Sequence, residues 1–149
     1  MKPAIAFLLA PFAAAVIGAA PSPVKTGHIS VTVTELRSSD GVVRACMTPD
    51  PAKFPKCRGV EGARSTIVPA SDTVRLVFEG VPPGRYAIAL LHDENNNGKA
   101  DRALMMMPKE GFGFSRDAKV RMGPPDFDDA AFQYDGGAAN QSIRMRYMF

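Results

Sequence analysis

The chain has 149 residues, of which 46% are hydrophobic, 22% charged and 8% aromatic. This length suits one domain with its own core, and the mixed composition excludes collagen-like, coiled-coil and largely disordered chains. The formal net charge of +3 is too small to indicate a nucleic-acid-binding surface, so we expect no nucleic acid among its partners.

The N-terminus has the pattern of a secretory signal peptide. Lys2 precedes an apolar run that Pro11 interrupts, and small residues follow as far as Ala20. The run is shorter than the ~20 residues that a membrane-spanning helix needs. We therefore expect residues 1–20 to be a signal peptide cleaved within a few residues of Ala20. Residues 21–149 would then form a single periplasmic or secreted domain with no membrane span.

The rest of the chain is typical of short β-strands separated by turns. Apolar and polar residues alternate, and this period of two places successive side chains on opposite faces of a strand. Turn sequences such as 38–41 and 81–84 separate these stretches. About seven strands without a convincing amphipathic helix predict an antiparallel β-sandwich, with a small barrel as the alternative. We expect strands over 28–36, 42–47, 73–78, 85–91 and 142–148, and weaker ones over 118–122 and 129–134.

The chain has two cysteines, Cys46 and Cys57, which enclose a short proline-containing segment. An even number of cysteines in an exported chain favours a disulfide. A bridge over so short a loop stabilises the fold by ~2–3 kcal/mol on the chain-entropy model. A redox site usually has CxxC spacing, and a metal site would need further ligands nearby. We therefore predict a structural disulfide between these two residues.

The most informative segment is the acidic, asparagine-rich stretch over residues 93–101. It reads D-x-N-x-N-G-x-x-D, which places side-chain oxygens at positions 1, 3, 5 and 9 and a glycine at position 6. In calcium-binding loops this spacing curls oxygen ligands around the ion, and the glycine permits the sharp turn. The sequence therefore predicts a calcium site that uses side-chain oxygens of Asp93, Asn95, Asn97 and Asp101.

Two further oxygens would complete this site. Lys99 stands at position 7, where calcium loops use the main-chain carbonyl. An EF-hand is excluded because Leu104 occupies position 12, where a Glu is required, and because a strand precedes the loop. Glu110 is the nearest later carboxylate, so we expect it to close the shell. The alternative is a solvated turn, since Asn97-Gly98 is a strong hairpin-turn dipeptide.

Three blocks of sequence resemble the signature of the domain of unknown function 2141 family (DUF2141). They are residues 81–87, 92–101 and 108–115. The resemblance implies an exported bacterial protein without an assigned activity, and a β-sandwich similar to transthyretin-like and carboxypeptidase-regulatory-like modules. The acidic loop with its trailing Glu110 also resembles the calcium loops of B-type repeats in bacterial surface adhesins.

Two positions depart from the pattern that the resemblance implies. Met106 stands where we expect the family's glycine, and Arg116-Asp117 replaces an Asn-rich pair after Ser115. The glycines of 111–115 suggest a tight backbone, with Phe112 or Phe114 packed or presented at a surface.

Two other chemistries remain as alternatives. A hydrolase could use Ser115, His92 and Glu110, but Ser115 lacks the G-x-S-x-G context of a nucleophile elbow. A copper-binding protein could use the thioethers of Met105–Met107, which are soft ligands. A contiguous triplet in a strand divides its side chains between two faces, so we expect these methionines to pack as apolar filler.

These patterns together predict a non-catalytic exported binding or structural module with a calcium-stabilised loop. Its cofactor would be Ca²⁺, its default state a monomer, and its partner an unidentified component of the cell envelope or the extracellular space.

Overall fold

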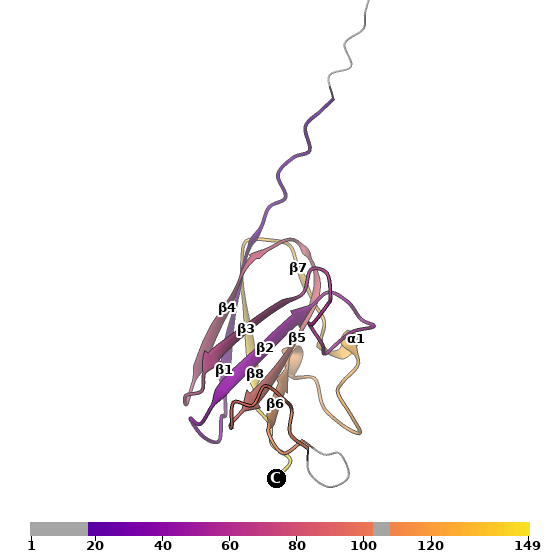
Figure 1. Cartoon of the computed structure of the whole chain (residues 1–149). Coiled ribbons are helices and arrows are strands. Elements are labelled where there is room, and N and C mark those ends of the chain that lie inside the picture. The colour runs from indigo at the N-terminus through magenta and orange to yellow at the C-terminus, as the bar shows by residue number, and fades with distance from the viewer. Residues whose placement is uncertain (1–17, 103–107) are drawn as a thin grey trace, which may run out of the picture.

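The computed structural model describes residues 18–102 and 108–149. The predicted signal peptide, up to residue 17, and Met105–Met107 lie outside the described residues. Residues 18–26 run as an extended, exposed segment away from the folded body (Figure 1). Within the described ranges, no helix is both long enough and apolar enough to span a bilayer.

The described residues form two sheets that pack face to face as a β-sandwich (Figure 1). One sheet has the order β4-β1-β8, and the other has the order β3-β2-β5-β6 with β7 paired to the first residues of β5. The first sheet consists of β1 (Gly27–Thr34), β4 (Val74–Val81) and β8 (Ala138–Arg144). The second consists of β2 (Val42–Thr48), β3 (Arg64–Pro69), β5 (Gly84–Asp93), β6 (Gly111–Phe114) and β7 (Phe132–Tyr134).

The main core lies between the sheets and is built from alternate strand residues. In β1, every second residue is buried and the intervening side chains face outward, as the period of two requires. The inward-facing residues of β2, β4, β5 and β8 meet them in one apolar cluster. Its fully buried members include Ile29, Val31, Val33, Val43, Met47, Val81, Ile88 and Ile143.

A second, smaller apolar cluster covers part of the outer face of the five-stranded sheet. Phe112 and Phe114 of β6 point into it and pack with Phe127 of the short helix α1 (Phe127–Ala130). The glycines between them face the other way. A Cβ on Gly113 would lie 2.8 Å from the side chain of Ile143, so the Gly-Phe-Gly-Phe alternation lets β6 approach β8 closely while its aromatic rings pack outside.

The predicted β-sandwich is confirmed, with differences in detail. The described residues form eight strands, and β1 pairs with β8 in parallel rather than antiparallel. The predicted strand 118–122 is absent, and 129–134 divides into the end of α1 and the three-residue β7. The last strand begins at Ala138 and ends at Arg144, about four residues earlier than the alternation over 142–148 indicated.

Strands β3 and β6 were not predicted, and their sequences explain why. Strand β3 is an edge strand whose exposed residues include Ile67, so apolar side chains do not mark its inner face. Strand β6 has four residues, two of which are glycines, and glycine is depleted in strands.

The predicted disulfide is present. Cys46 in β2 is bonded to Cys57, with 5.7 Å between their Cα atoms. The bridge ties the segment between β2 and β3 to the outer face of the sheet, where Phe54 packs against Phe114 and Phe127.

Candidate functional site

The candidate calcium loop begins at Asp93, the last residue of β5. The Asp93 side chain is fully buried and accepts hydrogen bonds from the backbone N–H groups of Asn97 (3.0 Å) and Gly98 (2.9 Å). Gly98 has a φ of 76°, a conformation that glycine adopts without a steric penalty. The chain therefore folds back over Asp93 at the point where the sequence pattern requires a sharp turn.

The middle of the loop brings three of the predicted ligands together. The amide groups of Asn95 and Asn97 donate to the Asp101 carboxylate at 2.7 to 3.1 Å. The Asn95 amide oxygen accepts the N–H of Asn97, and that of Asn97 accepts the N–H of Lys99. The side chains of Asn95 and Asn97 thus face Asp101 through their amide nitrogens, and their amide oxygens face the loop backbone.

Glu110 closes the loop from the other side, immediately before β6. Its side chain is buried, with 4% of the residue exposed, and its Oε2 accepts the backbone N–H of Asp101 at 3.1 Å. Its Oε1 atom is also buried but has no hydrogen-bond partner among the described residues. Buried polar atoms are almost always paired, and Oε1 of Glu110 and Oδ1 of Asp117 are the two exceptions among the described side chains.

Burial, hydrogen bonds and neighbouring charges shift the pKa values of the carboxyl groups in the loop. Burial raises the pKa of Glu110, backbone hydrogen bonds from Asp101 and Glu94 offset part of this shift, and the nearby charges of Asp101 and Asp93 raise the pKa further. Burial also tends to raise the pKa of Asp93, but hydrogen bonds from Arg44, Gly98 and Asn97 outweigh it and hold that pKa below its usual value. Hydrogen bonds from Asn97 and Asn95 lower the pKa of Asp101. Two carboxyl groups with lowered pKa values therefore lie beside a third whose pKa is raised.

Arg44, on the neighbouring strand β2, contributes a positive charge that the sequence did not predict. Its guanidinium forms an ion pair with Asp93 and donates to the Asn96 side chain at 2.9 Å. Arg44 lies opposite Leu91 in the register of β2 and β5, so it is a diagonal neighbour of Asp93. This contact could be found only with the strand register, which a single sequence does not provide.

The acidic side chains alone do not form a metal cluster. Among the described residues, no group of three or more His, Cys, Asp or Glu side chains is placed to hold a metal ion. A cation in this loop would need the amide oxygens of Asn95 and Asn97 and the carbonyl of Lys99 besides its carboxylates.

The residues of the alternative hydrolase are not arranged as a catalytic group. Ser115 is fully buried, and its hydroxyl donates to the Ala130 carbonyl at 2.6 Å while accepting the Ile88 N–H at 2.9 Å. His92 is also fully buried, and its ring nitrogens contact the Tyr147 hydroxyl and the Asp40 carbonyl. Within the described chain no hydrogen bond links Ser115, His92 and Glu110 to one another.

Comparison with known proteins identifies the family. A family model described as an uncharacterized protein conserved in bacteria, DUF2141, matches residues 31–142, which include most of both sheets and the sequence of the whole candidate loop. The chain belongs to the DUF2141 family. No curated protein and no solved structure gives a significant match.

One departure from the expected DUF2141 pattern has a structural explanation. Arg116 and Asp117 both have positive φ angles, 57° and 52°, and asparagine adopts this left-handed conformation more readily than most residues. An Asn-rich pair would therefore suit the backbone here. In this DUF2141 member Asp117 instead forms ion pairs with Arg144 and Arg146, which tie the turn after β6 to β8 and its continuation.

Proposed function

We propose that this DUF2141 protein is a non-catalytic exported binding or structural module whose 93–110 loop binds a calcium ion. The observation that carries the proposal is Glu110, a buried carboxylate whose Oε2 accepts the backbone N–H of Asp101 while its Oε1 has no hydrogen-bond partner among the described residues. A divalent cation would supply the missing partner of Oε1 and offset the repulsion from Asp93 and Asp101.

The remaining oxygens of the loop are compatible with this role. Carboxylate and amide oxygens have two lone pairs each, so an oxygen that accepts one backbone N–H can also contact an ion. Calcium takes 6–8 oxygen ligands in flexible geometry. Asp93, Asn95, Asn97, Asp101, Glu110 and the Lys99 carbonyl would provide such a set.

Arg44 sets the expected strength of binding. Because its guanidinium pairs with Asp93, it neutralises part of the negative charge available to the ion. Calcium affinity falls as the charge of the ligand set falls, and extracellular modules work with Kd values of ~10⁻⁴–10⁻³ M. We expect this weak class, which suits a protein outside the cytoplasm. Export itself is proposed from the N-terminal signal pattern, with the disulfide as further support.

Thermal unfolding with and without calcium tests the proposal. Ligands that bind the native state stabilise it, and a tenfold excess over Kd gives about 1.4 kcal/mol. For a domain of this size we expect the midpoint to rise by roughly 3–6 °C between excess chelator and millimolar calcium. Magnesium at the same concentration should have a smaller effect, because it requires stricter octahedral geometry.

Glu110→Gln provides the decisive variant. It removes the charge that the ion needs and keeps the shape, so the calcium-dependent shift should be largely lost while the midpoint in chelator stays equal or rises. Asp72→Asn, an exposed residue outside the loop, is the matched control and should keep the full shift. If millimolar calcium leaves the midpoint of the unmodified protein unchanged, the loop does not bind calcium and the proposal is wrong.

A further inference from the structure

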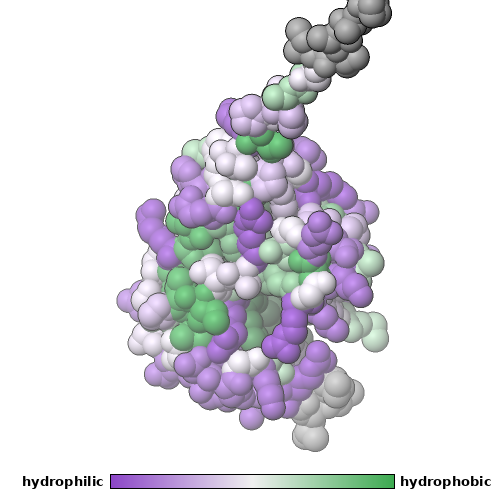
Figure 2. Space-filling model, turned by 45° about the horizontal axis from the view of Figure 1, so that its top comes forward, coloured by the Kyte–Doolittle hydropathy of each residue, from purple (hydrophilic) through white to green (hydrophobic). Residues whose placement is uncertain are grey.

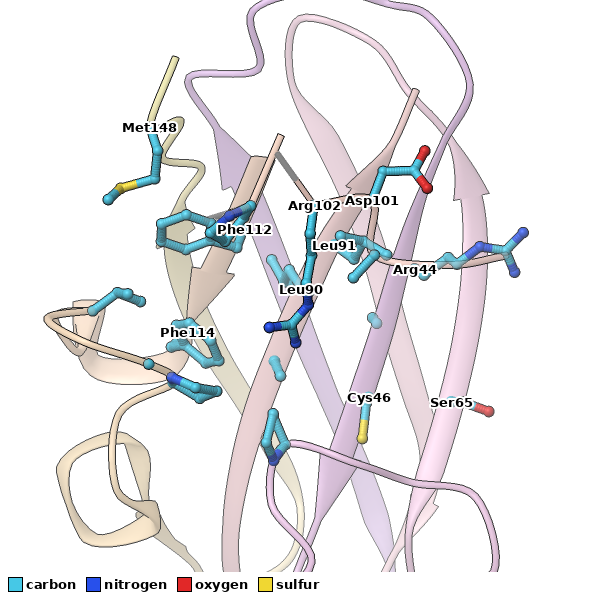
Figure 3. Close-up of a pocket in the computed structure, with 18 of the residues that line it drawn as sticks. Arg44, Cys46, Ser65, Leu90, Leu91, Asp101, Arg102, Phe112, Phe114 and Met148 are labelled. Atoms are coloured by element: carbon cyan, nitrogen blue, oxygen red, sulfur yellow. The ribbon is translucent and has the colours of Figure 1, made fainter. Parts of the chain in front are cut away.

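A groove lies on the outer face of the five-stranded sheet, next to the second apolar cluster (Figure 3). Its volume is about 730 Å³, within the range of ~300–1,000 Å³ that is typical of small-molecule sites. Its surface is mostly apolar and includes Ala89 and Leu91 of β5, Phe112 and Phe114 of β6, and Ile67 of β3. Figure 2 shows a face of the molecule with a hollow. Hydrophobic residues lie around the hollow, and hydrophilic residues lie farther out.

The charged residues of the groove differ in whether their charge already has a partner within the protein. Arg44 pairs with Asp93, and Asp101 accepts hydrogen bonds from Asn95 and Asn97. Figure 3 shows the Arg102 guanidinium reaching into the groove near Leu90, whereas the Asp101 carboxylate and the Arg44 guanidinium point away from it. Arg102 forms no ion pair with any residue that the structure describes, and the same holds for Arg121, another lining residue.

We propose that this groove binds a small single-chain amphiphile, an alkyl chain with one anionic head group. The chain would lie along Ala89, Leu91 and the two phenylalanine rings, and the head group would meet Arg102. The assignment follows from charge: an uncharged apolar ligand would remove water from the Arg102 guanidinium without replacing it, which is unfavourable. An anionic head group instead forms charge-assisted hydrogen bonds with it.

This site is separate from the calcium site, although the two are neighbours. Ala100, Asp101 and Arg102 form one end of the groove and also belong to the connection that contains the calcium ligands. Binding of the amphiphile requires Arg102 and the apolar floor, and it does not require Glu110. The two proposals therefore fail independently, and Glu110→Gln should still bind the amphiphile.

Isothermal titration calorimetry with n-octanesulfonate tests the proposal on the purified protein. The sulfonate remains anionic and can be used at constant calcium concentration. Octanesulfonate should bind at one site per chain, whereas n-octanol, which lacks the charge, and ethanesulfonate, which lacks the chain, should each bind at least fivefold more weakly. Equal binding of octanol, or binding of ethanesulfonate as tight as that of octanesulfonate, would overturn the proposal.

Two variants locate the site. Arg102→Gln should weaken octanesulfonate binding about five- to tenfold, as expected for loss of a charged hydrogen bond, while Arg75→Gln, an exposed β4 arginine outside the groove, should not. Ser65→Phe adds bulk at an exposed lining position and should abolish binding with an unchanged unfolding midpoint. Unaltered affinity in both Arg102→Gln and Ser65→Phe would contradict the assignment. So would concentration-dependent dimers, seen in sedimentation, that Ser65→Phe dissociates, because the groove would then be an interface.

Discussion

At the scale of single residues, the buried polar side chains divide into those that are satisfied and one that is not. Ser115 and His92 have partners for their polar atoms, and each joins separate segments of the chain. Because Asp40 offers a carbonyl, Nε2 of His92 donates to it, and the contact fixes the β1–β2 connection against β5. Oε1 of Glu110 has no hydrogen-bond partner among the described residues, and Oδ1 of Asp117, in the partly exposed turn after β6, is also without one.

Ser115→Ala tests whether the hydroxyl is structural. The substitution would leave the Ile88 N–H and the Ala130 carbonyl without their hydrogen-bond partner in a fully buried position. We expect the free energy of unfolding to fall by about 2–3 kcal/mol, measured by urea denaturation. Ser142→Ala, at an exposed position of β8, should change it by less than about 0.5 kcal/mol. A Ser115→Ala protein as stable as its Ser142→Ala counterpart would contradict this role.

The same residues show what a sequence can predict about a site. The sharp turn of the loop that contains Asp93, Asn95, Asn97 and Asp101 follows from local sequence, because Gly98 permits it; the use of these residues as calcium ligands stays a prediction. Glu110 was predicted only as the next carboxylate along the chain, and its burial depends on packing at the start of β6. The pairing of Arg44 with Asp93 depends on strand register, which local sequence does not encode.

At the scale of elements, ion pairs stabilise the turn after β6, although its backbone conformation is unfavourable for most residues. Asp117 pairs with Arg144 and Arg146 across the end of the sandwich, although its own φ is positive. Ion pairs of partly exposed residues contribute modestly. Here the two ion pairs also connect the segment after β6 to the chain after β8. That part of the chain pairs with β6 through two backbone hydrogen bonds between Arg146 and Phe112.

Asp117→Asn tests this contribution through its pH dependence. Hydrogen bonds from Arg144, then Arg146, lower the pKa of Asp117 in the folded protein. Its stabilising effect is therefore fully present above the pKa of an unfolded aspartate and is lost as the pH falls through the lower folded value. We expect Asp117→Asn to reduce stability by about 0.5–1 kcal/mol at pH 7, and the two proteins to converge in acid. Asn suits the left-handed backbone, so strain does not confuse the comparison.

A difference that persists unchanged from pH 7 to pH 2 would contradict this account of Asp117. Exposed Asp128, which pairs with Arg85, supplies the control. Asp128→Asn should have a smaller effect at any pH, because its carboxylate is largely in solvent.

Elements also differ in how well their sequences predicted them. Strands β1 and β4 alternate apolar and polar residues, whereas β2 and β5 are largely apolar. One face of each packs in the main core, and all four were predicted. Strand β3 pairs on one side only, and β6 uses Gly and Phe for two different packing faces. The parallel pairing of β8 with β1 joins the two ends of the fold, and no local pattern specifies it.

At the scale of the whole molecule, the sandwich supports its candidate functions on one outer face. The main core is enclosed between the sheets. Four other features lie on or beside the five-stranded sheet: the disulfide, the second apolar cluster, the groove and the 93–110 loop. The three-stranded sheet carries none of the proposed binding residues. This asymmetry fits a binding module that presents one functional face.

Both proposals concern the same connection between β5 and β6. The oxygens proposed to hold calcium belong to Asp93–Asp101 and Glu110, and Arg102 of the groove lies between them in sequence. Sequence patterns predicted the former from local spacing, but the groove arises from strands and loops that are distant in the chain, so no motif could indicate it.

A crystal structure of the protein grown with millimolar calcium tests the central claim most directly. The account predicts one ion with oxygens of Asp93, Asn95, Asn97, Lys99, Asp101 and Glu110 about 2.3–2.6 Å away, and with Oε1 of Glu110 among them. A structure in which the loop holds no ion at that calcium concentration, and in which Glu110 is instead completed by water or by a neighbouring backbone group, would contradict it.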